Sequence, residues 1–425
     1  MPDLTTELLP RLQAHKLPGL GSFSEFIHPK YEDQSILNIP STICAWMGVP
    51  GLEVNPLTSE ITNPLGSGIR RVVLILVDAL AFHRLQKWMG NAPVWGKLIQ
   101  EGVLAPLTSV VPSTTSSALT TLWTGLSQAT HGIIGYEMWL KEYGIVGDMI
   151  LHSPITFKGA VGSLELAGFS PYSFLLQPTL GSHLKVHGVK TYSSTHRSIA
   201  NSGLSRMLMQ DVEVRPFSTP ASMWVSIRNL IERAPDEWIY VWTYWGQVDG
   251  ISHYHGPDDE RAEAEFLYYS AAFEEFFFKK LSPEIRKDTL VILTADHGQT
   301  PTPLNPNYVL SNHHDLNQLL RIKPTCENRL VFLYPRPGQT QAVQDYILEH
   351  WPERFQLITH ETALQAGLFG PGPHHPDLGD RIGDLIAIAR QDTYLWWANQ
   401  DDFLLGRHGS LHHQDMLVPF LAARL

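Results

Sequence analysis

The chain has 425 residues, of which 43% are hydrophobic and 17% charged, and its formal net charge is −11 at pH 7. A chain of this length and apolar content can bury a large core, which excludes a largely disordered protein. The negative charge, with no Lys/Arg-rich tract in the sequence, argues against binding in a nucleic-acid groove.

The sequence shows neither a targeting signal nor a pattern of disulfide-bonded cysteines. No run approaches the roughly 20 apolar residues of a membrane span, and the amino-terminal residues lack the basic and apolar segments of a secretory signal. The two cysteines are too few for a disulfide framework. We therefore expect a cytoplasmic protein without a membrane partner, and the sequence leaves the oligomeric state open.

Residues 1–68 are rich in Pro and Gly and show weak periodicity, which predicts an N-terminal leader packed on the core. Residues 69–425 are predicted to form the main domain. The apolar run that begins it, 71–78, is typical of a strand buried on both faces of a parallel sheet. Similar runs at 238–244 and 289–296, with a helical pattern at 258–280, predict an α/β fold.

The expected fold class is thus a mainly parallel central sheet flanked by helices, with inserted cap subdomains. Insertions are predicted near 136–215 and 300–380. The second holds strand patterns at 329–333 and 354–359 and a helical pattern at 339–351. A further strand-like run follows at 381–389.

Three aspartates follow apolar runs. Asp78 and Asp296 stand where two of the runs stop, and Asp249 comes five residues after another. Ligands of open parallel sheets bind at the carboxyl ends of the strands, and three carboxylates gathered there would repel one another unless cations neutralise them. Taken singly, each aspartate also fits a helix cap or a turn.

Histidines accompany these aspartates. His297 is next to Asp296, His253 comes four residues after Asp249, and His408 lies near the C-terminus. Mixed carboxylate and imidazole ligands suit Zn²⁺, with Mn²⁺ as the alternative.

The segment 111–125 is crowded with Ser and Thr. Such a segment is typical of a turn whose hydroxyls cap a helix. A helix N-terminus is also a binding site for phosphate, because its free N–H groups and dipole favour anions.

These motifs, in this order, resemble the alkaline phosphatase superfamily, and within it the type I phosphodiesterases, also called nucleotide pyrophosphatase/phosphodiesterases. The resemblance covers roughly Arg71 to the C-terminus. The matching positions are Asp78 at a strand end, Pro112 to Thr115 with Thr124-Gly125, His131-Gly132, Asp249 to His253 with Gly256-Pro257, Asp296 to Gly298, and His408-Gly409.

The resemblance implies an alkaline-phosphatase-like metallohydrolase with two divalent metal ions per chain. One ion would be held by Asp78, Asp296, His297 and the Thr115 oxygen, and the other by Asp249, His253 and His408. Thr115 would be the nucleophile and form a covalent phospho-threonine intermediate. The implied substrates are small phosphate esters with phosphodiester or pyrophosphate bonds, such as nucleotides.

Some alternatives stay open. The adjacent Thr114 is a second candidate nucleophile, since only the register of the motif selects Thr115. The family usually carries an Asn that binds phosphate three residues after the nucleophile, and here that position is Ala118, so backbone N–H groups or Ser116 and Ser117 would have to replace it. A phosphomonoesterase on the same scaffold and a non-catalytic metal-binding relative are the competing functions.

Several other polar residues are expected to be solvated and without a role in the site. They are Arg70, Arg71, His412 and His413, with support of the neighbouring His408 as the alternative role for the two histidines.

Overall fold

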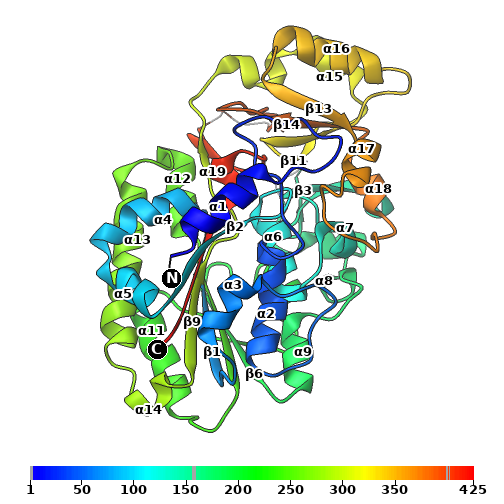
Figure 1. Cartoon of the computed structure of the whole chain (residues 1–425). Coiled ribbons are helices and arrows are strands. Elements are labelled where there is room, and N and C mark those ends of the chain that lie inside the picture. Colours follow the sequence, from blue (N-terminus) through cyan, green and yellow to red (C-terminus); the bar gives the residue numbers. More distant parts are fainter. Residues whose placement is uncertain (1–2, 156–158, 399–400, 402) are drawn as a thin grey trace.

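The computed structural model describes residues 3–155, 159–398, 401 and 403–425. It contains two seven-stranded sheets and a two-stranded ribbon. Figure 1 shows the main sheet between two layers of helices, with the second sheet beyond one end of it.

The main sheet has the order β2-β16-β9-β1-β8-β6-β7. Every residue of its central strand β1 is buried, and β1 pairs in parallel with both β8 and β9. By contrast, β16 runs antiparallel to its neighbours β2 and β9. The strands are β1 (Arg71–Val77), β2 (Gly102–Thr108), β6 (Lys190–Thr195), β7 (Glu213–Val214), β8 (Ile239–Trp245), β9 (Thr289–Thr294) and β16 (Leu417–Arg424).

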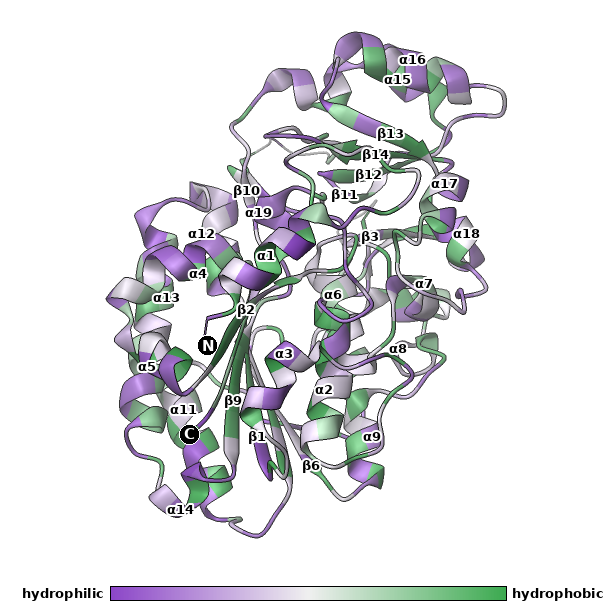
Figure 2. Cartoon of the chain, in the orientation of Figure 1, coloured by the Kyte–Doolittle hydropathy of each residue, from purple (hydrophilic) through white to green (hydrophobic). Residues whose placement is uncertain are grey.

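Helices cover both faces of this sheet (Figure 1). One layer contains α4 (Phe82–Trp88), α5 (Pro93–Glu101), α11 (Pro220–Glu232) and α13 (Glu260–Phe273), and the other contains α2 (Ile39–Trp46), α6 (Thr115–Thr124) and α9 (Leu180–Val186). Figure 2 shows strands such as β2 and β9 as largely hydrophobic, as expected for strands covered on both faces. The predicted fold class, a mainly parallel sheet flanked by helices, is confirmed.

The segment before β1 packs on the main sheet. Helix α1 (Thr5–Ala14) lies against β2, and its Leu8 and Leu12 are fully buried. The Leu4 N–H donates to the Leu104 carbonyl oxygen at 2.9 Å. The division of the chain into a leader and a main domain stays a prediction.

The second sheet is antiparallel, with the order β13-β14-β12-β11-β3-β4-β5. The segment 136–215 contributes to both sheets, because β3 to β5 join the second sheet while β6 and β7 join the main one. The strands are β3 (Glu137–Leu140), β4 (Ile145–Asp148), β5 (Ser153–Pro154), β11 (Thr325–Glu327), β12 (Leu330–Leu333), β13 (Phe355–Thr359) and β14 (Leu385–Ala389).

Shorter elements complete the fold. The ribbon pairs β10 (Thr300–Pro301) with β15 (Gly406–Arg407). The remaining helices are α3 (Ser59–Thr62), α7 (Gln128–His131), α8 (Pro171–Phe174), α10 (Gly203–Leu208), α12 (Gln247–His255), α14 (Pro283–Arg286), α15 (His314–Leu319), α16 (Thr340–His350), α17 (His360–Gln365), α18 (Leu378–Arg381) and α19 (His413–Met416). Within the described part of the chain, no helix combines the length and apolar character needed to cross a membrane.

The expectation that Arg71 is a solvated charge is wrong. Its side chain is 1% exposed, and its guanidinium donates to the carbonyl oxygen of Pro235. The long aliphatic stem lets an arginine at a strand start stay inside while its head reaches a backbone acceptor. Arg70 is partly exposed and lies near Asp236 and Asp288.

Candidate active site

The carboxyl ends of the parallel strands deliver the candidate ligands to one region. Asp78 directly follows β1, and Asp296 comes two residues after β9. Asp249 and His253 both lie on α12, which follows β8, and their spacing places them on the same face of the helix. This is the sheet edge at which the sequence predicted a site.

Asp78, Asp296 and His297 form a first group, whose ligating atoms lie within 4.8 Å of one another. His297 Nε2 is 3.5 Å from Asp78 Oδ1 and 3.6 Å from Asp296 Oδ2. These two buried oxygens have no hydrogen-bond partner among the described residues. Buried carboxylate oxygens without partners are costly, so the group fits a divalent cation.

Burial and neighbouring charges disfavour the ionised form of both carboxyl groups in this group. Burial, followed by the nearby carboxylates of Asp296 and Asp249, raises the pKa of Asp78 well above its ordinary value. Burial and Asp249 also raise the pKa of Asp296 to about 7. The Tyr244 hydroxyl donates to Asp78 Oδ2. The backbone N–H of His297 donates to Asp296 Oδ1 at 3.0 Å.

Asp249, His253 and His408 form a second group, also within 4.8 Å of one another. Asp249 Oδ1 lies 3.3 Å from His253 Nε2 and accepts a hydrogen bond from Gln299 Nε2 at 2.8 Å. Burial disfavours both charges, yet their attraction outweighs it. The attraction between the two side chains holds the pKa of Asp249 below its ordinary value and raises the pKa of His253 to about 9.

The three histidines are oriented by backbone carbonyls. Their Nδ1–H groups donate to Gly406 O from His253 at 2.8 Å, to Gly298 O from His297 at 2.9 Å and to Ser113 O from His408 at 3.0 Å. Each Nε2 is therefore left for the site, as in metal-binding histidines. The His297 and His408 rings stack at 3.8 Å, so the two groups are adjacent.

Thr115 is the first residue of α6 and is 8% exposed. Its Oγ1 lies 3.2 Å from His297 Nε2, whereas the Thr114 hydroxyl donates to Glu327 Oε1. Burial raises the pKa of Glu327, which comes from β11 of the second sheet, to about 8. The structure therefore directs Thr115, and not Thr114, toward the first Asp/His group.

The other hydroxyls of the segment have different partners. Ser116 Oγ donates to Gly135 O at 2.8 Å, and Ser117 Oγ donates to Ile133 O at 2.9 Å. Ala118 is fully buried inside the helix, and the Thr114 side chain does not cap α6. What this helix start offers an anion is therefore its backbone N–H groups and dipole.

Two glycines of the motifs are required by close approach. A Cβ on Gly298 would lie 2.0 Å from the Gln414 carbonyl oxygen. Gly409 has φ +115°, and a Cβ there would lie 2.6 Å from Glu327 Cβ. The Asp-His-Gly and His-Gly motifs thus encode packing as well as ligands.

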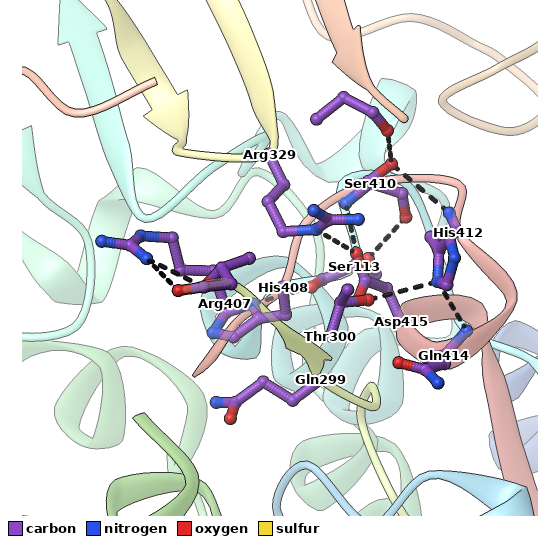
Figure 3. Close-up of polar contacts among 12 residues, drawn as sticks. Ser113, Gln299, Thr300, Arg329, Arg407, His408, Ser410, His412, Gln414 and Asp415 are labelled. Carbon is purple, nitrogen blue, oxygen red and sulfur yellow. Dashed lines mark hydrogen bonds and ion pairs between the residues drawn. The ribbon is translucent and has the colours of Figure 1, made fainter. Parts of the chain in front are cut away.

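Sequence reasoning missed several polar residues around the ligands, namely Tyr244, Gln299, Glu327, Arg329 and Asp415. Gln299 follows the Asp-His-Gly motif directly, which is a usable signal, but Arg329 and Asp415 carry none because their partners are distant in the chain. Figure 3 shows the network around His408, with Arg329 directed at Asp415 and with His412 on the other side of Asp415.

The expectation that His412 is solvated is wrong. It is 8% exposed and its Nδ1 lies 3.2 Å from Thr300 Oγ1. Its side chain also caps α19 by accepting from the Gln414 N–H. The neighbouring His413 is exposed, as expected. His131 is fully buried, and its Nε2 lies 3.0 Å from Thr121 Oγ1 of α6.

Solved structures share this fold. The structure of murine ectonucleotide pyrophosphatase/phosphodiesterase 5 is 20% identical, with a TM-score of 0.59 over 83% of this chain and 87% of that one. A phosphonoacetate hydrolase from Sinorhizobium meliloti 1021, in complex with phosphonoformate, is 17% identical, with a TM-score of 0.61 over 85% and 92%.

Sequence comparison identifies relatives of the same kind. The human ectonucleotide pyrophosphatase/phosphodiesterase family member 5 is 21% identical over 364 residues, which cover 83% of this chain and 68% of that protein. The model of the family described as type I phosphodiesterase / nucleotide pyrophosphatase matches residues 72–411. The chain therefore belongs to the type I phosphodiesterase / nucleotide pyrophosphatase family, hydrolases of the alkaline phosphatase superfamily.

Proposed function

We propose that this protein hydrolyses phosphodiester or pyrophosphate bonds of small, nucleotide-like substrates, with Thr115 as the nucleophile and two divalent metal ions as cofactors. One observation carries the proposal. Thr115 Oγ1 lies 3.2 Å from His297 Nε2, at the junction of two Asp/His groups that could each hold a metal ion.

The ligand sets follow from these groups. Asp78, Asp296, His297 and the Thr115 oxygen would hold one ion, and the second set would hold the other. That second set is Asp249, His253 and His408. Carboxylate and imidazole donors favour Zn²⁺, with Mn²⁺ as the alternative. When bound, the two ions would neutralise the buried carboxylates and stabilise negative charge on the reacting oxygens.

The residues of the chain then have defined roles. Thr115 Oγ loses its proton to solvent and attacks phosphorus. The bond between phosphorus and the leaving-group oxygen breaks, and that oxygen departs with the bonding pair and is protonated by solvent. This forms a covalent phospho-threonine that keeps the other substituent of the phosphorus. Water then cleaves the bond between phosphorus and Thr115 Oγ, which restores the hydroxyl and releases the phosphate monoester. Since the Ser116 and Ser117 hydroxyls are bonded to carbonyls, we assign the backbone N–H groups at the start of α6 to the phosphoryl oxygens in place of an Asn side chain.

Relatives support the substrate class and the nucleophile. One solved structure of the murine protein is described as an inactive threonine-to-alanine variant in complex with AMP; it is 19% identical, with a TM-score of 0.59 over 83% of this chain and 87% of that one. A threonine needed for activity and a bound nucleotide are what this proposal predicts for the present chain.

The test is hydrolysis of bis-p-nitrophenyl phosphate and p-nitrophenyl phosphate with Zn²⁺ or Mn²⁺. Thr115→Ala should lower kcat/KM for the diester by about 1000-fold or more, since a loss of several kcal/mol of transition-state stabilisation has that effect. Thr114→Ala is the matched control, because the same hydroxyl and methyl groups are removed one residue away, and it should retain activity within about tenfold.

Each other outcome contradicts a defined part of the proposal. Activity that survives Thr115→Ala but not Thr114→Ala would assign the nucleophile to Thr114. A higher kcat/KM for the monoester would favour a phosphomonoesterase. Protein that binds two ions per chain and hydrolyses neither compound would favour a non-catalytic relative.

A further inference from the structure

A fully buried ion pair joins the second sheet to the loop that carries His408. Arg329 Nε lies 3.0 Å from Asp415 Oδ2, and both side chains are 0% exposed. Arg329 directly precedes β12, whereas Asp415 lies in α19, directly ahead of β16 of the main sheet. Figure 3 shows the guanidinium and the carboxylate facing each other beside Ser410 and Thr300.

The guanidinium is fixed by further acceptors. Arg329 donates from one terminal nitrogen to Thr393 O at 2.6 Å and from the other to Gln391 O at 2.9 Å. Both carbonyls belong to the segment that follows β14. The arginine is thus fixed to the second sheet and the segment after it, with a hydrogen bond from each of its three guanidinium nitrogens.

The Asp415 carboxylate is linked to the chain on both sides of His408, directly through Ser410 and indirectly through Thr300. Oδ2 accepts from the Ser410 N–H at 3.1 Å, two residues after His408. Oδ1 accepts from the Thr300 hydroxyl at 2.6 Å, and Thr300 pairs with Arg407, directly before His408, across the β10–β15 ribbon.

These contacts reach the nucleophile segment as well. Ser113 Oγ donates to Ser410 O at 2.9 Å, and Ser113 O accepts the hydrogen bond from His408. Loss of the carboxylate would leave the Ser410 N–H buried without its acceptor and would remove the shorter of the two contacts of the Thr300 hydroxyl, which favours rearrangement of this loop.

We propose that Arg329 and Asp415 are a positioning pair that sets the His408 imidazole for metal binding, so that the second sheet helps to build the metal centre. The inference rests on the proposed two-metal site. It differs from a merely structural role in one respect: the ion held by Asp249, His253 and His408 should be weakened, and the other should not.

The test is Co²⁺ titration of the metal-free full chain, followed by visible absorption. The variant is Arg329→Met with Asp415→Leu, because replacing both partners by apolar residues avoids leaving one buried charge alone. One of the two ions should bind about 10- to 100-fold more weakly, as for other residues that support metal ligands. The weakened absorption band should be the one that His408→Ala removes.

The matched control is an exposed pair from the same part of the molecule, Arg321 and Asp384, whose atoms are 2.9 Å apart. Arg321→Met with Asp384→Leu should bind both ions as the parent does. Arg329→Lys keeps the positive charge but loses the planar guanidinium, so it should show a smaller loss of affinity that is confined to the same ion. If the double variant does not fold, Arg329→Lys is used for the test.

Two results would overturn the inference. Folded variants that bind both ions with the parent's affinities, or that weaken both equally, would reduce the pair to a structural contact while the proposed function stands. A parent protein that binds fewer than two ions would contradict the proposed metal centre and the inference together.

Discussion

Among single residues, the two aspartates of the first Asp/His group are electrostatically unfavourable when both are ionised. Asp78 and Asp296 are buried beside each other, and each has an oxygen without a hydrogen-bond partner in the described chain. Burial raises the pKa of both carboxyl groups. A folded protein keeps such a pair when a bound cation compensates for it.

This cost predicts a pH dependence for the metal-free protein. The folded pKa of Asp296, about 7, lies above its ordinary value of 3.8, so the folded state binds this proton more tightly than the unfolded state does. The stability contribution is present at low pH and is lost as the pH rises through about 7. The stabilisation of the metal-free protein by Asp296→Asn should therefore be larger at about pH 8 than at about pH 5, by more than about 1 kcal/mol.

Urea unfolding in the presence of a chelator measures this difference. Buried histidines such as His131, whose pKa burial lowers to about 3, act in the opposite direction, so parent and variant are compared at each pH. Asp236→Asn is the control, because that side chain is 97% exposed. An Asp296→Asn effect that is equal at the two pH values would contradict the raised pKa.

At the scale of elements, the site depends on a close contact between the end of β9 and α19. The Gly298 N–H donates to the Asp415 carbonyl oxygen at 2.8 Å. A side chain at residue 298 would meet the Gln414 carbonyl at 2.0 Å and Ala81 Cβ at 2.7 Å. The turn that carries Asp296 and His297 can therefore pack directly against α19 only because residue 298 has no Cβ.

Gly298→Ala should lower the free energy of unfolding by about 2 kcal/mol or more, since a rigid backbone contact cannot yield as a flexible side chain does. It should also reduce metal binding, because the adjacent His297 would move. Gly96→Ala in α5, where a Cβ meets nothing within 4 Å, should instead be neutral or stabilise by up to about 1 kcal/mol. Thermal or urea unfolding checks both, and a Gly298→Ala protein as stable as the parent would refute the contact argument.

The elements also show what sequence could and could not predict. Strands β1, β8 and β9 were predicted because strands buried on both faces read as apolar runs. Strand β6 contains Lys, Thr, Tyr and Ser and lacks that signal, yet it pairs with β8 along its whole length. Its pairing is decided by neighbours distant in the chain, and local pattern does not contain them.

For the whole molecule, the same division holds at the site. The six Asp and His residues and Thr115 were found from motifs at strand ends, and the structure brings them together. Glu327, Arg329 and Asp415 were not found, because each acquires its role only when the second sheet packs over the main one. Sequence motifs thus predicted residues that lie together in the structure, and tertiary packing adds polar groups around them that the motifs do not contain.

The central claim is that Thr115 attacks the phosphoryl group. The direct measurement is rapid acid quenching of the metal-loaded protein during turnover of a diester, followed by peptide mass analysis. We expect a phosphoryl adduct on Thr115, absent from Thr115→Ala and present in Thr114→Ala. An active enzyme with the adduct on another residue, or with none at any quench time, would contradict it.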